Sequence, residues 1–131
     1  MKNILLACAM ASLAISTTAS AADDTAPSKG EARLTKMLEG RVAGKPQSCI
    51  PAMLSDRLKI IDKTAVVYDA GKTIYVARPQ DPQSLDTDDI LVIKRFGSQL
   101  CKQDIIHTID RVSGFMTGVV FLGDFVPYTK E

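Results

Sequence analysis

A stretch in the middle of the chain, Arg57 to Pro79, has the composition of a β-hairpin with two apolar faces. Between Thr64 and Ala77, β-branched and aromatic residues stand on both sides of the turn residues Asp69-Ala70-Gly71. Because Ala70 resists the positive φ of a two-residue type I′ turn, we expect a type I turn with a left-handed Gly71 in a bulge.

That turn sets a register for the hairpin. The facing pairs that we expect are Val66 with Ile74 and Thr64 with Val76 on one face, while Val67 and Tyr75 lie on the other face. Since both faces are apolar, the hairpin should lie inside a sheet or barrel that is covered on two sides.

The first 21 residues have the three parts of a secretory signal peptide. Lys2 gives a basic start, an apolar run follows from Ile4 to Ile15, and small residues close the segment with an A-x-A pattern. We expect cleavage after Ala21, with Ala22 as the alternative, and a protein in the periplasm or the medium. An uncleaved anchor is disfavoured because the apolar run is well short of the ~20 residues that a span needs.

The charge balance narrows the classes of partner. The chain has 16 Lys and Arg against 15 Asp and Glu, and one of the cations, Lys2, belongs to the signal. A protein that binds nucleic acid or a membrane surface usually has a basic excess, so neither partner is expected. No span is expected after cleavage. Residues 22–30 should form a flexible leader, and residues 31–131 a single small domain.

Cys49 and Cys101 form an even pair once Cys8 leaves with the signal. Lipidation of Cys8 is disfavoured because only Ile4 to Ala7 would serve as the apolar segment before it. In an oxidising compartment the pair predicts one disulfide. A redox pair usually has the C-x-x-C spacing, and a thiolate metal site needs about four close ligands, so both alternatives are weaker.

One short helix is expected at Glu31 to Glu39, where Gly40 follows as a stop. Ser28 is its expected N-cap, and Glu31 would complete a capping box. After the hairpin, Pro79 to Asp89 should be a loop. Further strands are expected at Ser48–Ile50, Leu58–Ile61, Ile90–Lys94, Asp104–Ile109, Val119–Phe121 and Phe125–Tyr128.

The last two of these strands should be joined by a tight turn at Leu122-Gly123-Asp124. Pro127 has no N–H to donate, so the final strand should lie at an edge or end there. The expected fold class is mainly β (α+β). It is a small antiparallel barrel or sandwich of six to seven short strands, with the N-terminal helix packed on one side or end.

Three stretches resemble a family of small exported bacterial proteins that has no assigned function. They are CIPAMLSDRLKIIDKTAVVYDAGKTIYVARP, the later QLC and the closing LGDFVPY, and the similarity covers about Gly44 to Tyr128. It rests on the paired cysteines and the hydrophobic spacing. The resemblance implies a single exported domain with one disulfide, and it implies no catalytic or ligand residue.

His107, the single histidine, is the first candidate for acid–base chemistry, with Asp104 and Asp110 each three residues away. On a strand, that offset places both carboxylates on the opposite face from the imidazole. No G-x-S-x-G motif marks a nucleophile. A histidine on a strand without a catalytic role is therefore the favoured interpretation.

Asp86, Asp88 and Asp89 suggest a weak calcium candidate. Leu91 and Gly97 stand where an EF-hand loop counted from Asp86 would need glycine and glutamate. We favour carboxylates that accept backbone hydrogen bonds at a turn. No metal and no cofactor are predicted. The cations Lys94, Arg95 and Lys102 are interpreted as a solvated rim.

The leading functional hypothesis is a non-enzymatic binding module that is exported and associates with a periplasmic protein or an envelope component. Two loops, 40–47 and 79–89, should carry the contacts, because loops on a rigid scaffold commonly do. The candidate contact residues are Lys45, Gln47, Asp81, Gln83 and Asp86. The alternatives are an inhibitor of a secreted hydrolase (lysozyme or protease type) and, less favoured, a hydrolase that uses His107.

Overall fold

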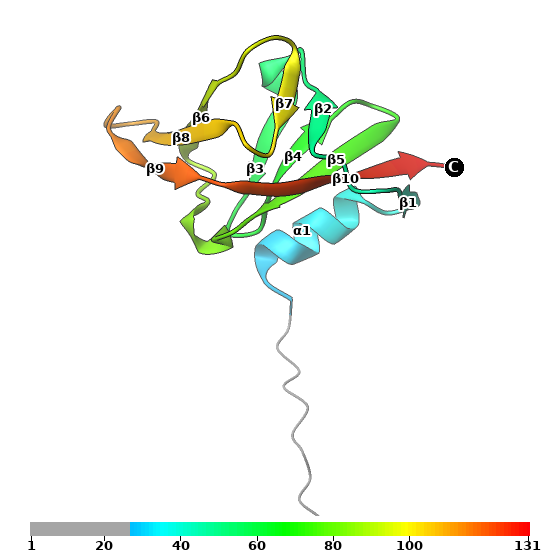
Figure 1. Cartoon of the computed structure of the whole chain (residues 1–131). Helices are drawn as coiled ribbons and strands as arrows, with labels where there is room; N and C mark the ends of the chain where they lie inside the picture. Colours follow the sequence, from blue (N-terminus) through cyan, green and yellow to red (C-terminus); the bar gives the residue numbers. More distant parts are fainter. Residues whose placement is uncertain (1–26) are drawn as a thin grey trace, which may run out of the picture.

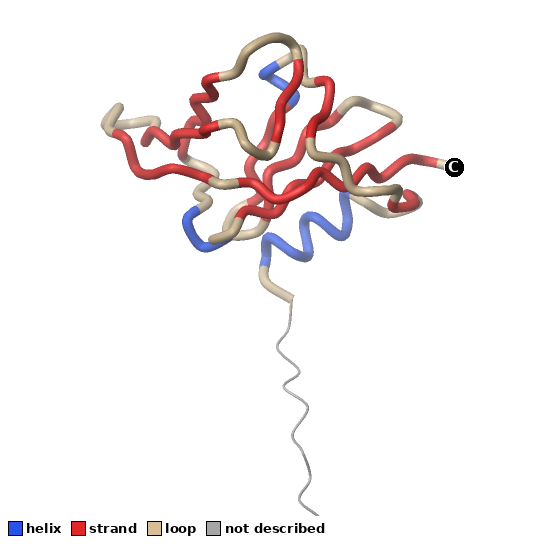
Figure 2. Tube along the Cα trace, in the orientation of Figure 1, coloured by secondary structure: helices blue, strands red, loops and turns tan. Residues whose placement is uncertain are grey.

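The computed structural model describes residues 27–131, so the expected signal peptide and most of the expected leader lie outside the described residues (Figure 1). These described residues form one α-helix and ten strands (Figure 2). They are α1 (Lys29–Met37), β1 (Arg41–Ala43), β2 (Cys49–Pro51), β3 (Leu58–Ile61), β4 (Ala65–Asp69), β5 (Thr73–Pro79), β6 (Asp89–Lys94), β7 (Gln99–Cys101), β8 (Ile105–Asp110), β9 (Met116–Val120) and β10 (Leu122–Lys130). Single 3-10 turns stand at Ser55–Arg57 and Pro82–Ser84.

The strands form three antiparallel sheets. Their orders are β1-β10-β5-β4-β3, β6-β8-β9 and β2-β7. Only residue 121 separates β9 from β10, so the chain passes directly from the three-stranded sheet into the five-stranded one (Figure 1). At the other ends of these two sheets, β3 and β6 each have a single strand neighbour. The sheets therefore do not close into a barrel, and we call the open side between β3 and β6 the seam.

The mainly β, antiparallel, disulfide-bridged fold is confirmed, and its arrangement is sandwich-like. Ten strands replace the six or seven that we expected, partly because β1, β2 and β7 have only three residues each. Strands that short leave almost no periodic signal in a sequence. The helix begins at Lys29, so the last two residues of the expected leader belong to α1.

The β4–β5 hairpin separates two apolar clusters, as its two apolar faces predicted. One cluster, between the sheets, includes Val66, Tyr68 and Ala77. The other lies against α1 and includes Leu34, Val67 and Val76. Burial of the hairpin on both faces makes it the centre of the fold.

The expected register of this hairpin is wrong. Val66 faces Ala77, Val67 faces Val76 and Tyr68 faces Tyr75. Gly71 is left-handed as expected, with φ of 88°, but Asp69 pairs with Ile74 and leaves a loop of four residues. Asp69 Oδ1 accepts a hydrogen bond from the Gly71 N–H at 2.8 Å, which stabilises this longer turn. A shift by an odd number of residues exchanges the faces, so Val66 and Val76 lie on opposite sides.

The expected turn at Leu122–Asp124 is also wrong, because these residues open the nine-residue strand β10. The register against β5 shifts by one residue between Leu122 and Phe125, which is the mark of a β-bulge. A Cβ at Gly123 would lie 3.0 Å from the carbonyl oxygen of Arg78. Glycine there permits the close approach of two backbones. In the sequence alone, the same glycine suggests a turn.

Pro127 lies within β10, between β1 and β5, rather than at an edge or a strand end. Its carbonyl accepts a hydrogen bond from the Gly44 N–H at 2.7 Å, on the side away from β5. In a strand, the N–H and C=O of one residue point to the same side. The side of Pro127 that lacks an N–H therefore points away from β5, toward the residues that follow the end of β1. No hydrogen bond between β10 and β5 is lost.

The disulfide between Cys49 and Cys101 is present, with an S–S distance of 2.01 Å. The two cysteines face each other in the β2–β7 ladder. Their neighbours Ile50 and Leu100 are almost fully buried in the cluster between the sheets. The bridge thus holds a small two-stranded sheet onto the core.

Helix α1 begins at the expected cap, since Ser28 Oγ accepts a hydrogen bond from the Glu31 N–H at 3.2 Å. The second half of the capping box does not form. The Glu31 carboxylate instead binds the Arg78 guanidinium of β5, with N–O distances of 2.5 and 3.1 Å. This hydrogen-bonded ion pair lowers the pKa of Glu31. It also fixes the helix against the sheet.

Replacing Glu31 by glutamine should flatten the acid side of the stability profile. The folded-state pKa of Glu31 is lowered below 4.5, so its contribution is present above that pH and is lost as the pH falls through the folded pKa. Both side chains are partly exposed, which limits the effect to about 1 kcal/mol at neutral pH. Urea titrations from pH 7 to pH 3 should show wild type and Glu31→Gln converging. Parallel curves would contradict this, and Glu39→Gln is the control.

Gly30→Ala should destabilise the protein, although alanine normally favours a helix over glycine by about 1 kcal/mol. A Cβ at Gly30 would meet Thr64 Oγ1 and the backbone carbonyl oxygen of Asp62 at well under contact distance. The helix would have to move off the sheet, at a cost of about 1–3 kcal/mol. Thermal unfolding measures this, with exposed Thr35→Ala as the control. A stabilised Gly30→Ala variant would mean that α1 does not pack this closely.

Candidate ligand-binding cleft

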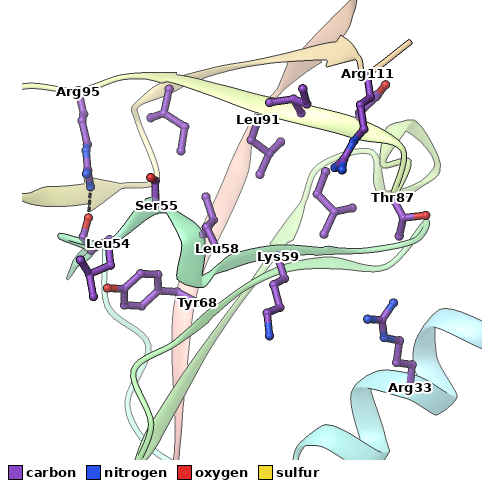
Figure 3. A pocket seen from close by; sticks show the side chains of 15 residues that line it. Arg33, Leu54, Ser55, Leu58, Lys59, Tyr68, Thr87, Leu91, Arg95 and Arg111 are labelled. Atoms are coloured by element: carbon purple, nitrogen blue, oxygen red, sulfur yellow. Dashed lines mark hydrogen bonds between the residues drawn. The ribbon is translucent and has the colours of Figure 1, made fainter.

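A cleft of about 510 Å³ lies at the seam, between the unpaired sides of β3 and β6 (Figure 3). Pockets that bind small molecules commonly have volumes of ~300–1,000 Å³. The walls come from five places in the sequence: α1, residues 52–60 up to and including most of β3, Tyr68 of β4, residues 87–95 around β6, and the turn between β8 and β9. The cleft therefore exists only because tertiary packing brings these segments together.

The floor of the cleft is apolar because strand alternation turns one set of side chains inward. On β3 these are Leu58 and Ile60, and on β6 they are Leu91 and Ile93. All four are only partly buried, and they pack against the cluster between the sheets. Had the sheets closed, these side chains would be covered. The open seam leaves an apolar surface at the bottom of a groove.

Four cations surround this floor: Arg33, Lys59, Arg95 and Arg111. Figure 3 shows Arg33, from α1, and Arg111 reaching toward the Thr87 end of the cleft from opposite sides. Arg95 stands at the other end, where its guanidinium donates to the Ala52 carbonyl. Across residues 27–131, the ion pairs are Arg78–Glu31 and Lys102–Asp124. Within that part of the chain, no rim cation has a carboxylate within 4.0 Å.

Asp89 is the one acidic residue in the lining, and it is almost buried. The Thr117 hydroxyl lies 2.8 Å from both Asp89 Oδ2 and Thr108 Oγ1. With a single hydrogen, that hydroxyl donates to the carboxylate and accepts from Thr108. Asp89 is thus held by neighbouring strands, and the lining as a whole is cationic.

His107 does not lie in the cleft. It faces Val92 and Val119 across the ladders of β8, on the outer side of the three-stranded sheet. Its Nδ1 atom is buried without a hydrogen-bond partner among the described residues. The cross-strand neighbours of the imidazole are both apolar.

The structure does not bring the two candidate carboxylates to His107. Asp104 Oδ2 accepts from the Cys101 N–H at 2.7 Å. Asp110 Oδ1 accepts from the N–H groups of Val112 and Ser113, at 3.1 and 2.6 Å. The hydrogen bond from the Ser113 backbone is the main reason that the pKa of Asp110 is lowered. Both carboxylates accept backbone hydrogen bonds at turns.

The aspartates of the 79–89 loop separate as well. Asp86 Oδ1 accepts from the Asp88 N–H at 2.8 Å, the turn role that we favoured. Asp89 points inward from β6, away from the other two. Between residues 27 and 131, no three His, Cys, Asp or Glu side chains are grouped so as to hold a metal ion.

The candidate contact residues of the loops lie outside the cleft. Lys45, Gln47, Asp81, Gln83 and Asp86 are all exposed, and none of them lines it. The Gln47 backbone is fixed by two hydrogen bonds of 2.8 Å to Phe125. Asp81 Oδ1 accepts from the Gln83 N–H at 3.2 Å. From the 79–89 loop, it is Thr87 and Asp89 that reach the cleft.

Lys94, Arg95 and Lys102, which we interpreted as a solvated rim, have different surroundings. Lys102 pairs with Asp124 at 2.7 Å, and only Arg95 reaches the cleft. Sequence reasoning missed the other three rim cations and the apolar floor. A signal for the floor existed on β6, where Leu91 and Ile93 alternate with Ile90 and Val92. Because both sets are apolar, the pattern did not reveal which set faces the interior.

No protein-family model, curated protein or solved structure matches this chain. Among residues 27–131, the single α-helix has nine residues and is too short to cross a bilayer.

Proposed function

We propose that the protein is an exported, non-enzymatic binding module that holds an envelope or periplasmic ligand in the cleft at the seam. The observation that carries this proposal is the cleft itself: an apolar floor of suitable volume beneath four cations that have no carboxylate partner in residues 27–131. Uncompensated cations beside apolar surface are typical of a ligand site, since a few convergent polar groups on an apolar lining give orientation and specificity.

Export is supported by the signal-like first 21 residues and by the disulfide, which persists in oxidising compartments. The resemblance to small exported proteins also supports export. A binding role rather than catalysis is supported by the distance in the fold between His107 and the cleft, and by the turn roles of Asp104 and Asp110. The cleft lining has no histidine and no cysteine that would serve as base or nucleophile.

The test is hydrogen–deuterium exchange on the mature, oxidised protein, with and without a cell-envelope extract of the host. A ligand in the cleft should slow exchange at β3 (Leu58–Ile61) and β6 (Asp89–Lys94), because it covers the unpaired sides of both strands. Exchange at β1, which contributes no residue to the cleft lining, should not change. Protection confined to the loops 40–47 and 79–85, or an absence of protection, would contradict the proposal.

A further inference from the structure

We infer that the ligand of the cleft is an anionic amphiphile with a single acyl chain, bound with the chain along the seam and the charged head between Arg33 and Arg111. This inference rests on the proposed function and names its ligand class. Ligands of this class have a carboxylate or a similar anion on an unbranched chain, and the one that we propose is a free fatty acid.

The floor fits an acyl chain. Its side chains, Leu54, Leu58, Ile60, Leu91 and Ile93, are all aliphatic, with Tyr68 beside them. Strands rise ~3.3 Å per residue, so the span from Asp89 to Ile93 is about 13 Å, which an extended medium-length chain fills. Burying the chain there removes apolar area from water on both surfaces, at roughly 25 cal/mol per Å².

The cations fit an anionic head at one end. Arg33 and Arg111 come from separate elements and flank Thr87, whose side chain lies at the same end of the cleft (Figure 3). Two guanidinium groups bind a carboxylate with geometric specificity, because each presents paired N–H donors. Asp89 is the opposing charge in the lining, and its hydrogen bond from Thr117 directs one oxygen away to β9. At this end of the cleft, two guanidinium groups stand against one carboxylate in the lining, which favours an anion.

The opposite end of the cleft favours an amphiphile over an acidic peptide. There the segments 52–54 and 95–98 lie together, joined by a 3.1 Å hydrogen bond from the Ala52 N–H to the Ser98 carbonyl. Both segments expose large apolar side chains to solvent: Met53 at 73%, Leu54 at 50% and Phe96 at 102%. An apolar collar of this kind extends the floor to the surface, where an acyl tail, but not a charged chain, gains from contact with it.

The experiment is isothermal titration calorimetry of the mature, oxidised protein with sodium laurate below its micelle concentration. Dodecyltrimethylammonium, which has the same chain and the opposite charge, is the matched ligand. The charge-reversed double variant Arg33→Glu/Arg111→Glu is compared with Lys36→Glu/Lys130→Glu, which changes net charge equally at exposed positions outside the cleft. Leu54→Gln tests the floor at a half-exposed position that the fold tolerates.

We expect laurate to bind and dodecyltrimethylammonium not to bind. Arg33→Glu/Arg111→Glu should weaken laurate binding about tenfold or more, while the control double variant keeps wild-type affinity. Leu54→Gln should weaken it a few-fold. Equal binding of both amphiphiles, or equal losses in both double variants, would overturn the inference, as would a failure of laurate to bind.

Further measurements distinguish a failure of this inference from a failure of the proposed function. If the envelope extract protects β3 and β6 but laurate does not bind, the cleft is a site and the ligand class is wrong. If protease treatment of the extract abolishes the protection, the ligand is a peptide and the inference falls. If the protein sediments with phosphatidylglycerol vesicles but does not bind laurate, its ligand is a bilayer surface and the inference of a free amphiphile is wrong.

Discussion

Replacing Cys49 and Cys101 by serine is expected to lower the free energy of unfolding by about 4 kcal/mol. The bridge closes a loop of 52 sequence positions, and its loss returns that loop's freedom to the unfolded chain. The native state loses a constraint as well, because β2 and β7 pair over three residues only. An isolated two-stranded ribbon is marginal in water, so the core residues Ile50 and Leu100 depend on the bridge.

Urea denaturation followed by circular dichroism measures this loss, with the oxidised wild type as reference. Wild type unfolded in excess dithiothreitol should match the Cys49→Ser/Cys101→Ser variant, which separates the covalent link from the effect of the serines. Should the variant be unfolded without urea, titration with a stabilising osmolyte recovers the comparison. A loss under about 1 kcal/mol would show that β2 and β7 are held by packing alone.

Phe125→Ala is expected to destabilise the protein by about 3–5 kcal/mol. Phe125 is 1% exposed and follows the bulge that redirects β10 toward β5. It packs in the cluster between the sheets, beside residues from both. Its backbone also pairs with Gln47 in both directions. Truncation leaves a cavity where several elements meet, so the site has little room to collapse.

The matched control is Phe121→Ala, four residues earlier and 55% exposed. Its cost should be within about 1 kcal/mol, as for most surface positions. Chemical denaturation of the two variants and the wild type gives both values. Similar losses for the two phenylalanines would contradict the placement of Phe125 in the core and of the bulge that puts it there.

Most of the elements could be predicted from the sequence, because local patterns determine them. The helix start followed from Ser28 and the central hairpin from its β-branched residues, and both are present. The register of the hairpin could not be predicted. It depends on whether Asp69 belongs to the turn or pairs with Ile74 at the end of the ladder. Asp69 pairs with Ile74, and its carboxylate stabilises the four-residue loop that follows by a hydrogen bond from Gly71. An error of three positions then places Ile74 and Val76 on the face of Val66, whereas in the structure they share the face of Val67.

The cleft could not be predicted for a different reason. Arg33 and Arg111 are far apart in the sequence, and only the packing of α1 and the β8–β9 turn around the seam brings them to one end of the cleft. Pro127 and Gly123 carried misleading signals, because a proline and a glycine suit a bulged inner strand as well as an edge and a turn. His107 lies on a strand, as expected, with Val92 opposite it.

The seam is tested most directly by cross-strand nuclear Overhauser effects in the isotope-labelled, oxidised protein. The structure predicts that backbone protons of β3 show such effects to β4 alone, and those of β6 to β8 alone. It also predicts effects between β8 and β9 and, in the other sheet, between β10 and β5. Backbone contacts between β3 and β6 would mean a closed barrel without a cleft, and the proposed ligand site would not exist.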